Sequence, residues 1–250
     1  MKEKIRIEEL RKSFGPKTVL DGLSFSVYEG EILCILGKSG TGKSVILKHL
    51  VGFLIPDGGR IFVDGAEFTG AGEKARDEIR AKYGILFQGA ALFDSMDIYD
   101  NVAFGLRRKK ISEVEIAGIV PEMLERVGLR GVERKKPSEL SGGMQKRAGL
   151  ARAIAMRPEI MLYDEPTTGV DPITAGAVDR LILKMRADFG ITSVVVTHDI
   201  NSAYRVADRI VMLLDGKVLM EGSPDLFRNT DEPRVRQFVE GRAAGPVTIA

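Results

Sequence analysis

The stretch Gly37-Lys38-Ser39-Gly40-Thr41-Gly42-Lys43-Ser44 determines how the rest of the chain must be organised. It follows a continuous apolar run, residues 32–36, that is typical of a strand buried on both faces. Residues 45–52 then have the spacing of a helix. A glycine-rich loop of this form between a strand and a helix binds phosphate, because backbone N–H groups and the helix N-terminus surround the anion. The stretch therefore predicts a nucleotide site, with Lys43 on the β- and γ-phosphates and the Ser44 hydroxyl on Mg²⁺.

Length and composition limit the other classes of function. A chain of 250 residues forms one large domain, or one domain with a subdomain. The net charge of +2 is too weak to indicate a nucleic-acid partner. The single cysteine, Cys34, excludes an internal disulfide and is predicted to be a core residue. Because no secretory leader follows Met1 and no apolar run approaches the roughly 20 residues of a membrane span, we expect a cytosolic protein that reaches membranes only through partners.

The remaining hydrophobic patterns predict an α/β fold. Two alternating segments, around 5–10 and 23–27, indicate antiparallel strands in front of the loop. Apolar strands then alternate with helices from residue 160 to 214, which predicts a mostly parallel sheet. The predicted fold is a P-loop NTPase core with an antiparallel β subdomain and an inserted helical subdomain. The predicted boundaries are 1–222 for the ATP-binding domain, about 93–155 for the helical subdomain and 223–250 for a C-terminal extension.

Polar residues that suit catalysis follow two of the buried strands. The carboxylates of Asp164 and Glu165 come at the end of the strand 160–163, where ligands bind in such sheets. Asp164 is predicted to hold the Mg²⁺ shell, and Glu165 to accept a proton from attacking water. His198 leaves the sheet at the same edge and could contact a γ-phosphate or position water. His49, inside the helix after the loop, is interpreted as structural.

A second anion-binding sequence lies at Ser141-Gly142-Gly143, just before another helical stretch. The chain thus offers two phosphate-binding helix ends for one obvious nucleotide. One chain could fold both ends onto one ATP. Alternatively, two chains could meet head to tail, each completing the other's site.

Taken together, these motifs resemble the ATP-binding subunits of ABC transporters. The resemblance covers residues 1 to about 222 and rests on motifs that occur in the family's order: Gly37–Ser44, Gln88, Leu140–Gly143, Leu162–Glu165, Gly169–Asp171 and His198. It implies a head-to-tail dimer that encloses two ATP molecules, with Gln88 linking Mg²⁺ and water to a membrane partner and Asp171 coupling the two sites. It also implies that Phe14, whose position alone allows either a turn anchor or an adenine platform, stacks on adenine.

A narrower resemblance points to the lipid-transport ATPases of the Mla type. It rests on Met144, Tyr163, the stretch 89–96 after Gln88, and the stretch 233–238. It implies an integral-membrane permease, an MCE-type substrate-binding protein and often a small STAS-domain accessory subunit, with the ATPase on the cytoplasmic face of the inner membrane. The alternative is an ABC transporter ATPase for another small apolar substrate. A soluble ATPase acting on nucleic acid or ribosomes is disfavoured, since the chain lacks the long insertion or tandem domain of that class.

Two segments keep alternative interpretations. The apolar patch at Ala90–Phe93 and Met96 divides between subdomain core and a groove for the permease. In the extension, Val235, Phe238 and Val239 form one apolar helix face. That segment is either a frayed terminus or a tail that crosses to the partner subunit.

Overall fold

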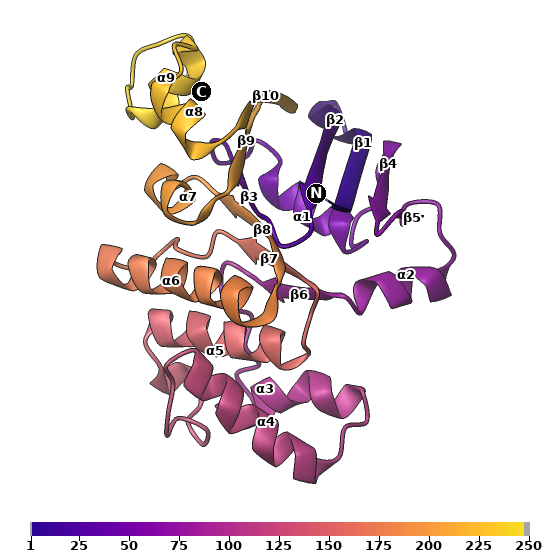
Figure 1. Cartoon of the computed structure of the whole chain (residues 1–250), viewed down its shortest axis with the longest axis vertical. Helices are drawn as coiled ribbons and strands as arrows, with labels where there is room; N and C mark the ends of the chain where they lie inside the picture. Colours follow the sequence, from indigo (N-terminus) through magenta and orange to yellow (C-terminus); the bar gives the residue numbers. More distant parts are fainter. Residues whose placement is uncertain (1, 248–250) are drawn as a thin grey trace.

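The computed structural model describes residues 2–247 and shows two β-sheets with a helix between them (Figure 1). The first sheet is antiparallel, in the order β2-β1-β4-β5. Its side chains alternate between buried and exposed, because only one face packs on the core. Its strands are β1 (Glu3–Phe14), β2 (Lys17–Tyr28), β4 (Gly58–Val63) and β5 (Ala66–Glu67).

The second sheet carries the phosphate-binding loop and has the order β10-β9-β3-β8-β7-β6. Its strands are parallel except for β10, which runs antiparallel to β9 at one edge. Every residue of β3 and β8 is buried, since apolar clusters cover both faces of the sheet. The strands are β3 (Ile32–Leu36), β6 (Tyr83–Leu86), β7 (Ile160–Asp164), β8 (Thr192–Thr197), β9 (Arg209–Leu214) and β10 (Lys217–Gly222).

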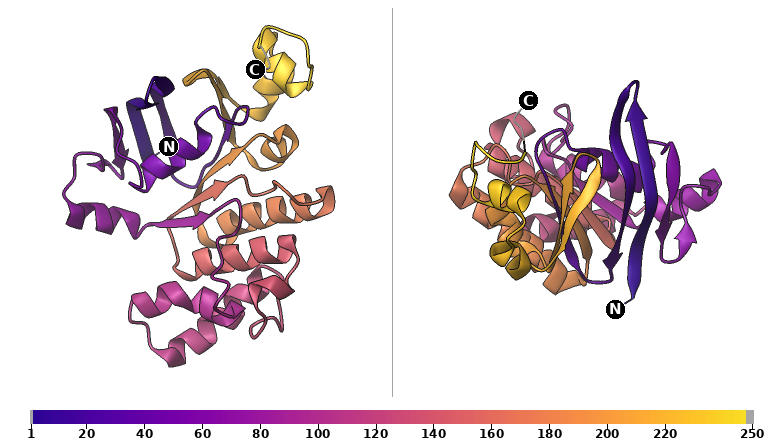
Figure 2. Two further views of the ribbon diagram at one scale, coloured as in Figure 1. Left: turned by 180° about the vertical axis from the view of Figure 1, so that it is seen from behind. Right: turned by 90° about the horizontal axis from the view of Figure 1, so that it is seen from above.

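The parallel sheet separates two hydrophobic cores, each of which includes helices. Helix α1 (Lys43–Leu50) packs in the core between the two sheets (Figure 2). The opposite face of the parallel sheet is covered by the longer helices, which share one continuous core with it. The other helices are α2 (Glu73–Arg80), α3 (Ile98–Arg108), α4 (Glu113–Arg126), η1 (Pro137–Glu139), α5 (Gly142–Ala155), α6 (Pro172–Phe189), α7 (Ile200–Val206), α8 (Pro224–Asn229) and α9 (Pro233–Val239).

The helical segment after β6 forms its own corner of the molecule, at the bottom of Figure 1. Helices α3 and α4 pack against each other and against α5. Helix α4 begins with a capping box, in which Ser112 and Glu115 satisfy each other's backbone N–H groups. Its buried face contains Ile116 and Val120, as the three- and four-residue spacing predicted. Helix α5 also packs on β6, so the helical segment shares contacts with the parallel sheet. The subdomain boundaries at about 93 and 155 therefore stay predictions.

Most strands occur where the pattern predicted them, but the edges of the sheet differ. The apolar run Ile85-Leu86-Phe87 predicts a short strand, and the structure has β6 there, which begins at Tyr83 and ends at Leu86, so Phe87 lies outside it. Its pairing with β7 stops at Leu86 opposite Tyr163, which explains the earlier end. Helix α2, strand β10 and helix α8 were not predicted, and all three are short.

The C-terminal extension packs against the core of its own chain. Val235 and Phe227 are fully buried, and Phe238 and Val239 pack against the same core. The interpretation of α9 as a frayed terminus is therefore wrong, since its predicted apolar face contributes to the core. Crossing of the tail to a partner stays a prediction, and residues 248–250 lie outside the described part.

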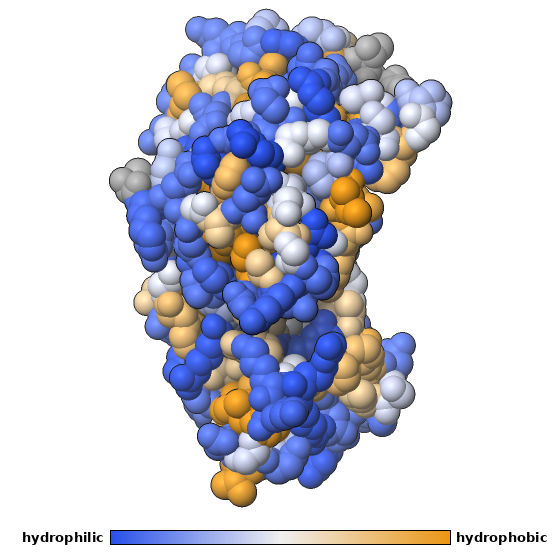
Figure 3. Space-filling view, turned by 90° about the vertical axis from the view of Figure 1, so that its right-hand side faces the viewer, coloured by the Kyte–Doolittle hydropathy of each residue, from blue (hydrophilic) through white to orange (hydrophobic). Residues whose placement is uncertain are grey.

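Within residues 2–247, no helix combines the length and apolar character needed to cross a membrane. The face shown in Figure 3 is mostly hydrophilic, with apolar atoms in small separate groups.

Candidate active site

The phosphate-binding loop connects β3 to α1 and depends on glycine at its last turn. Gly42 precedes α1 with a φ of 96°, a conformation that other residues rarely adopt. A Cβ atom there would also lie 2.8 Å from the Leu20 side chain. The close packing of β2 on the loop therefore requires glycine at this position.

Lys43, the first residue of α1, points its ammonium back into the loop. Its Nζ donates to the carbonyl oxygens of Gly37 at 2.7 Å and Lys38 at 2.9 Å. Burial lowers the pKa of Lys43, while the Glu165 carboxylate, 3.4 Å away, opposes that change. A buried ammonium held by backbone carbonyls can turn to a stronger acceptor such as a phosphate oxygen.

The Ser44 hydroxyl and the Asp164 carboxylate meet where β7 ends. Ser44 Oγ donates to Asp164 Oδ1 at 2.8 Å, across 120 residues of sequence. Gln88, just after β6, lines the same cavity and adds an amide oxygen. A hydroxyl, a carboxylate and an amide are all hard oxygen donors, which is the set that Mg²⁺ accepts beside nucleotide phosphates. The residues present therefore fit a magnesium ion.

Glu165 is the most constrained residue of the cavity. Its φ of 47° lies in the left-handed region, which is unfavourable for a non-glycine residue. Its Oε2 accepts from His198 Nδ1 at 2.8 Å and from Thr168 Oγ1 at 3.1 Å. Because an ionised carboxylate only accepts hydrogen bonds, Nδ1 of His198 carries the proton in this pair. The carboxylate is thus held in one place, where it can take a proton from water.

Lys43, Ser44, Gln88, Glu165 and His198 line one cavity of about 530 Å³, and Asp164 directly precedes Glu165 beside it. Phe14 stands at its rim, 47% exposed, at the end of β1. Nine residues predicted from the sequence line this cavity: Phe14, Ser39, Gly40, Gly42, Lys43, Ser44, Gln88, Glu165 and His198. Four lining residues were not predicted: Lys17, Val19, Val45 and Thr168. For Lys17, a cation directly after the turn that follows Phe14 is a signal that could have identified it.

Eight predicted site residues are outside the described lining of this cavity. Four of them are close to lining residues in the chain: Gly37, Lys38, Thr41 and Asp164. The other four belong to two further helix ends. Ser141 caps α5 by accepting from the backbone N–H of Met144 at 3.3 Å. Asp171 caps α6 in the same manner, accepting from the N–H groups of Ile173 and Thr174, each at 3.0 Å. Ser141, Gly142 and Asp171 are exposed, and Gly143 is half-buried. The structure therefore displays a second helix N-terminus at the surface rather than folding it over the first.

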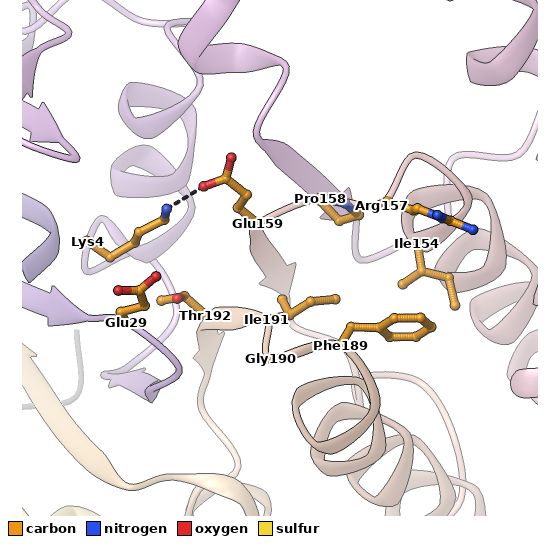
Figure 4. Close-up of a pocket in the computed structure, with 10 residues that line it drawn as sticks. All are labelled: Lys4, Glu29, Ile154, Arg157, Pro158, Glu159, Phe189, Gly190, Ile191 and Thr192. Carbon is orange, nitrogen blue, oxygen red and sulfur yellow. Dashed lines mark hydrogen bonds and ion pairs between the residues drawn. The ribbon is translucent and has the colours of Figure 1, made fainter. Parts of the chain in front are cut away.

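A cavity of similar size, about 510 Å³, lies at the opposite ends of the parallel strands (Figure 4). Its lining includes Ile154, Phe189 and Ile191, with Lys4 and Glu159 on one side. Lys4 forms ion pairs with Glu159 at 2.5 Å and with Asp64 at 2.8 Å, so its charge is compensated. None of the predicted site residues is among its described lining residues, and the candidate active site is therefore the cavity at the phosphate-binding loop.

Comparisons with known proteins identify the family of this chain. The sequence profile of the ABC transporter family matches residues 20–168, more than half of the chain. A probable ribonucleotide transport ATP-binding protein, mkl of Mycobacterium leprae, is 45% identical over 247 residues, covering 98% of this chain and 71% of the relative. The intermembrane phospholipid transport system ATP-binding protein MlaF of Escherichia coli K12 is 41% identical over 234 residues, covering 93% of this chain and 87% of the relative.

A solved structure of an ATP-binding cassette has the same fold. The ATP-binding cassette MJ0796, seen as a dimer in a post-hydrolysis state with ADP and phosphate, superposes with a TM-score of 0.81 at 32% identity. The match covers 88% of this chain and 98% of that one. The P-loop NTPase fold predicted from the sequence is thus confirmed. The chain belongs to the ABC transporter family, as an ATP-binding subunit that hydrolyses ATP.

Proposed function

We propose that this chain encloses Mg²⁺ and ATP between its own phosphate-binding loop and the α5 N-terminus of a second copy. In this arrangement ATP hydrolysis powers phospholipid transport through a membrane permease. The observation that carries the dimer is the separation of the two anion-binding helix ends. The α1 end opens into the cavity, whereas Ser141 and Gly142 at the α5 end are exposed and outside it. The dimeric state of MJ0796, a relative of the same fold, supports the arrangement.

The residues around the phosphates have separate roles in this proposal. The glycines of 37–42 present backbone N–H groups to the phosphates. Lys43 exchanges the two loop carbonyls for the β- and γ-phosphate oxygens. Ser44, Asp164 and Gln88 hold Mg²⁺, which neutralises phosphate charge when bound. Phe14 stacks on adenine through its exposed ring.

Glu165 acts as the general base, and its neighbours keep it in position. Its carboxylate takes a proton from the water that attacks the γ-phosphate. His198 holds that carboxylate through Nδ1 and can contact the γ-phosphate side of the site. We assign Asp171, at the start of α6, to coupling between the two sites of the dimer.

Partners at the membrane are inferred from the surface after Gln88. Phe87 and Phe93 are 36% and 41% exposed, whereas Ala90 is buried. The predicted patch is thus divided between core and surface, and its exposed Phe93 ring, together with the exposed Phe87 outside the patch, suits a groove for a permease helix. The proposal includes an MCE-type substrate-binding protein and a STAS-domain accessory subunit, with the ATPase on the cytoplasmic face of the inner membrane.

The substrate is assigned from the relatives. MlaF is named for phospholipid transport, and mkl for ribonucleotide transport. The stretch after Gln88 and the segment at 233–238 favour the lipid assignment, since both resemble Mla-type ATPases. A ribonucleotide is the second candidate, because the relative with that name is 45% identical.

Reconstitution distinguishes the two substrates. The chain is assembled with its permease in proteoliposomes, and ATP-dependent movement of a fluorescent phospholipid and of a radiolabelled ribonucleotide is measured. We expect lipid movement that requires ATP and stops in the Glu165→Gln variant. ATP-dependent ribonucleotide uptake without lipid movement would contradict the lipid assignment.

A further inference from the structure

Lys146 is a buried cation that contacts the loop carrying Glu165. It lies on α5, five residues after the cap Ser141, and is only 6% exposed. Burial lowers the pKa of Lys146, since an ammonium loses its hydration there. A charge in such a position destabilises the fold unless other groups compensate it.

The negative charge of Glu165 and the backbone carbonyls of one loop compensate this ammonium. Lys146 Nζ donates to the carbonyl oxygens of Thr168 at 2.7 Å and Pro166 at 2.9 Å. The Glu165 carbonyl lies 3.4 Å away as a third, weaker acceptor. An ammonium has three N–H donors, so this one side chain can hold three carbonyl groups of the loop from Glu165 to Thr168.

That loop sets the position of the Glu165 carboxylate. The loop closes as a turn, in which the Thr168 N–H donates to the Glu165 carbonyl at 3.2 Å. The Thr168 hydroxyl donates to the Glu165 carboxylate. Since Glu165 has an unfavourable φ of 47°, its backbone needs contacts that hold it there. Lys146 provides such contacts at both ends of the turn.

The same helix is fastened to a second loop of the site. Arg152, six residues further along α5, donates to the carbonyls of Ala90 at 2.9 Å and Ala91 at 2.6 Å. Both alanines have positive φ values, 59° and 51°, and they follow Gln88 closely. Helix α5 thus holds the loop after Gln88 and the loop after Glu165 by side chains to backbone oxygens.

We propose that Lys146 is a positioning residue that transmits contact at the α5 N-terminus to the general base Glu165 of the same chain. This rests on the proposed role of Glu165. In a head-to-tail dimer the α5 N-terminus touches the ATP bound to the other chain. Lys146 then connects one ATP site to the base of the other, through one turn of helix and one side chain.

The test is a double-mutant cycle in the full-length chain. Lys146→Met keeps the apolar stem and removes all three donors. We expect kcat for ATP hydrolysis to fall about 10- to 100-fold with KM within about threefold, because a small displacement of a catalytic group has an effect of that order. In the Glu165→Gln background the same change should have no further effect, since both residues act through one carboxylate.

A conservative variant and a matched control complete the design. Lys146→Gln retains two N–H donors and should recover activity to within about fivefold of wild type. Lys184→Met is the control, because Lys184 is exposed on α6 and its Nζ donates to a single carbonyl, that of Arg126, at 3.2 Å. Its kcat should match wild type. If Lys146→Met does not fold, the cycle is run with Lys146→Gln, whose smaller loss must likewise vanish beside Glu165→Gln.

The outcomes separate this inference from the proposed function. Wild-type kcat in folded Lys146→Met, or a double variant at least tenfold slower than Glu165→Gln alone, would overturn the role of Lys146. Rapid hydrolysis by Glu165→Gln itself would instead remove Glu165 from the mechanism, and the proposed function would fail first.

Discussion

Two helix N-termini in this chain have the composition of an anion site, but they are used differently. The α1 end opens into the cavity of about 530 Å³, with Lys43 and Ser44 facing Asp164 and Glu165. The α5 end has no charged side chain of its own: Ser141 caps the helix, and Gly142 is exposed. The first end therefore carries both the anion site and the chemistry, whereas the second offers only backbone donors and a hydroxyl.

This difference shows how a catalytic centre can be divided between copies of one chain. A phosphate at the α1 end meets a cation, a metal site and a base. A phosphate at the α5 end would meet a helix dipole and N–H groups, which bind an anion but cannot activate water. Each end lacks what the other has, so a head-to-tail pair completes both sites.

The largest expected effect tests that division directly. Lys43→Ala and Ser141→Arg should each abolish ATP occlusion when present in every chain, since each breaks both sites of a homodimer. A mixed dimer of the two variants contains one doubly broken site and one intact site. We expect equimolar mixing to restore occlusion of one ATP per mixed dimer, measured with radiolabelled nucleotide after gel filtration.

The control for this mixing experiment is Ser112→Arg, which also places arginine at an exposed helix cap, that of α4. It should occlude ATP normally. If mixing restores no occlusion although both variants are folded, each chain builds its own site. The two helix ends would then not complete each other in a head-to-tail pair.

Removal of the base should have the next largest effect. Glu165→Gln keeps the size of the side chain but loses the proton acceptor, so hydrolysis should fall by about 10²–10⁴ while ATP binding persists. The variant should accumulate as an ATP-bound dimer, detected by light scattering. Steady turnover within a few-fold of wild type would show that the α1 end does not carry the chemistry through Glu165.

The adenine contact should have a smaller effect. Phe14→Ala removes an aromatic ring that is 47% exposed at the cavity rim. Stacking of a base on an aromatic side chain contributes about 1–3 kcal/mol, so the Kd for ATP should rise about 5- to 150-fold. Phe53→Ala is the matched control, because Phe53 is 64% exposed and outside the described lining of the cavity. Equal Kd values for both variants, by titration with a fluorescent ATP analogue, would leave Phe14 only as an anchor for the turn.

The sequence was sufficient for the parts of the site that depend on local pattern. The buried strand β3, the glycines of 37–42 and the pair Asp164-Glu165 each have a signature within a few residues. Ser44 and Asp164 were both predicted at the Mg²⁺ site, and they lie within hydrogen-bond distance because parallel strands end at one edge of the sheet. These features could be predicted because strand order and loop chemistry determine them.

Residues that act through tertiary contacts could not be predicted in this way. In the sequence, Lys146 looks like any lysine of a basic helix, and only docking of α5 on the loop 165–168 buries it. The short helix α2 and the edge strand β10 have too few residues for a clear period. Burial of Val235 likewise depends on the core that α8 and α9 share with the main sheet.

The smallest effect concerns how the α5 end is held, and it is one of stability. A Cβ on Gly143 would lie 2.5 Å from the methyl group of Thr174, in the first turn of α6, whereas a Cβ on Gly142 would meet nothing within 4 Å. Thr174 has little freedom to move away, because its hydroxyl donates to Asp171 at 2.5 Å. Gly143→Ala therefore has an overpacking cost of about 2 kcal/mol, offset by about 1 kcal/mol of helix preference, so stability should fall by about 1 kcal/mol. For a chain of this size the Tm should fall by about 2–4 °C in calorimetry of the nucleotide-free chain.

Gly142→Ala is the matched control and should leave the Tm unchanged or higher, since alanine favours the helix. Adding Thr174→Ser to Gly143→Ala removes the clashing methyl group, keeps the hydroxyl and should restore the Tm. If the two alanine variants have the same Tm, contact with α6 does not position the α5 end, and the exposed anion site depends on its own cap alone.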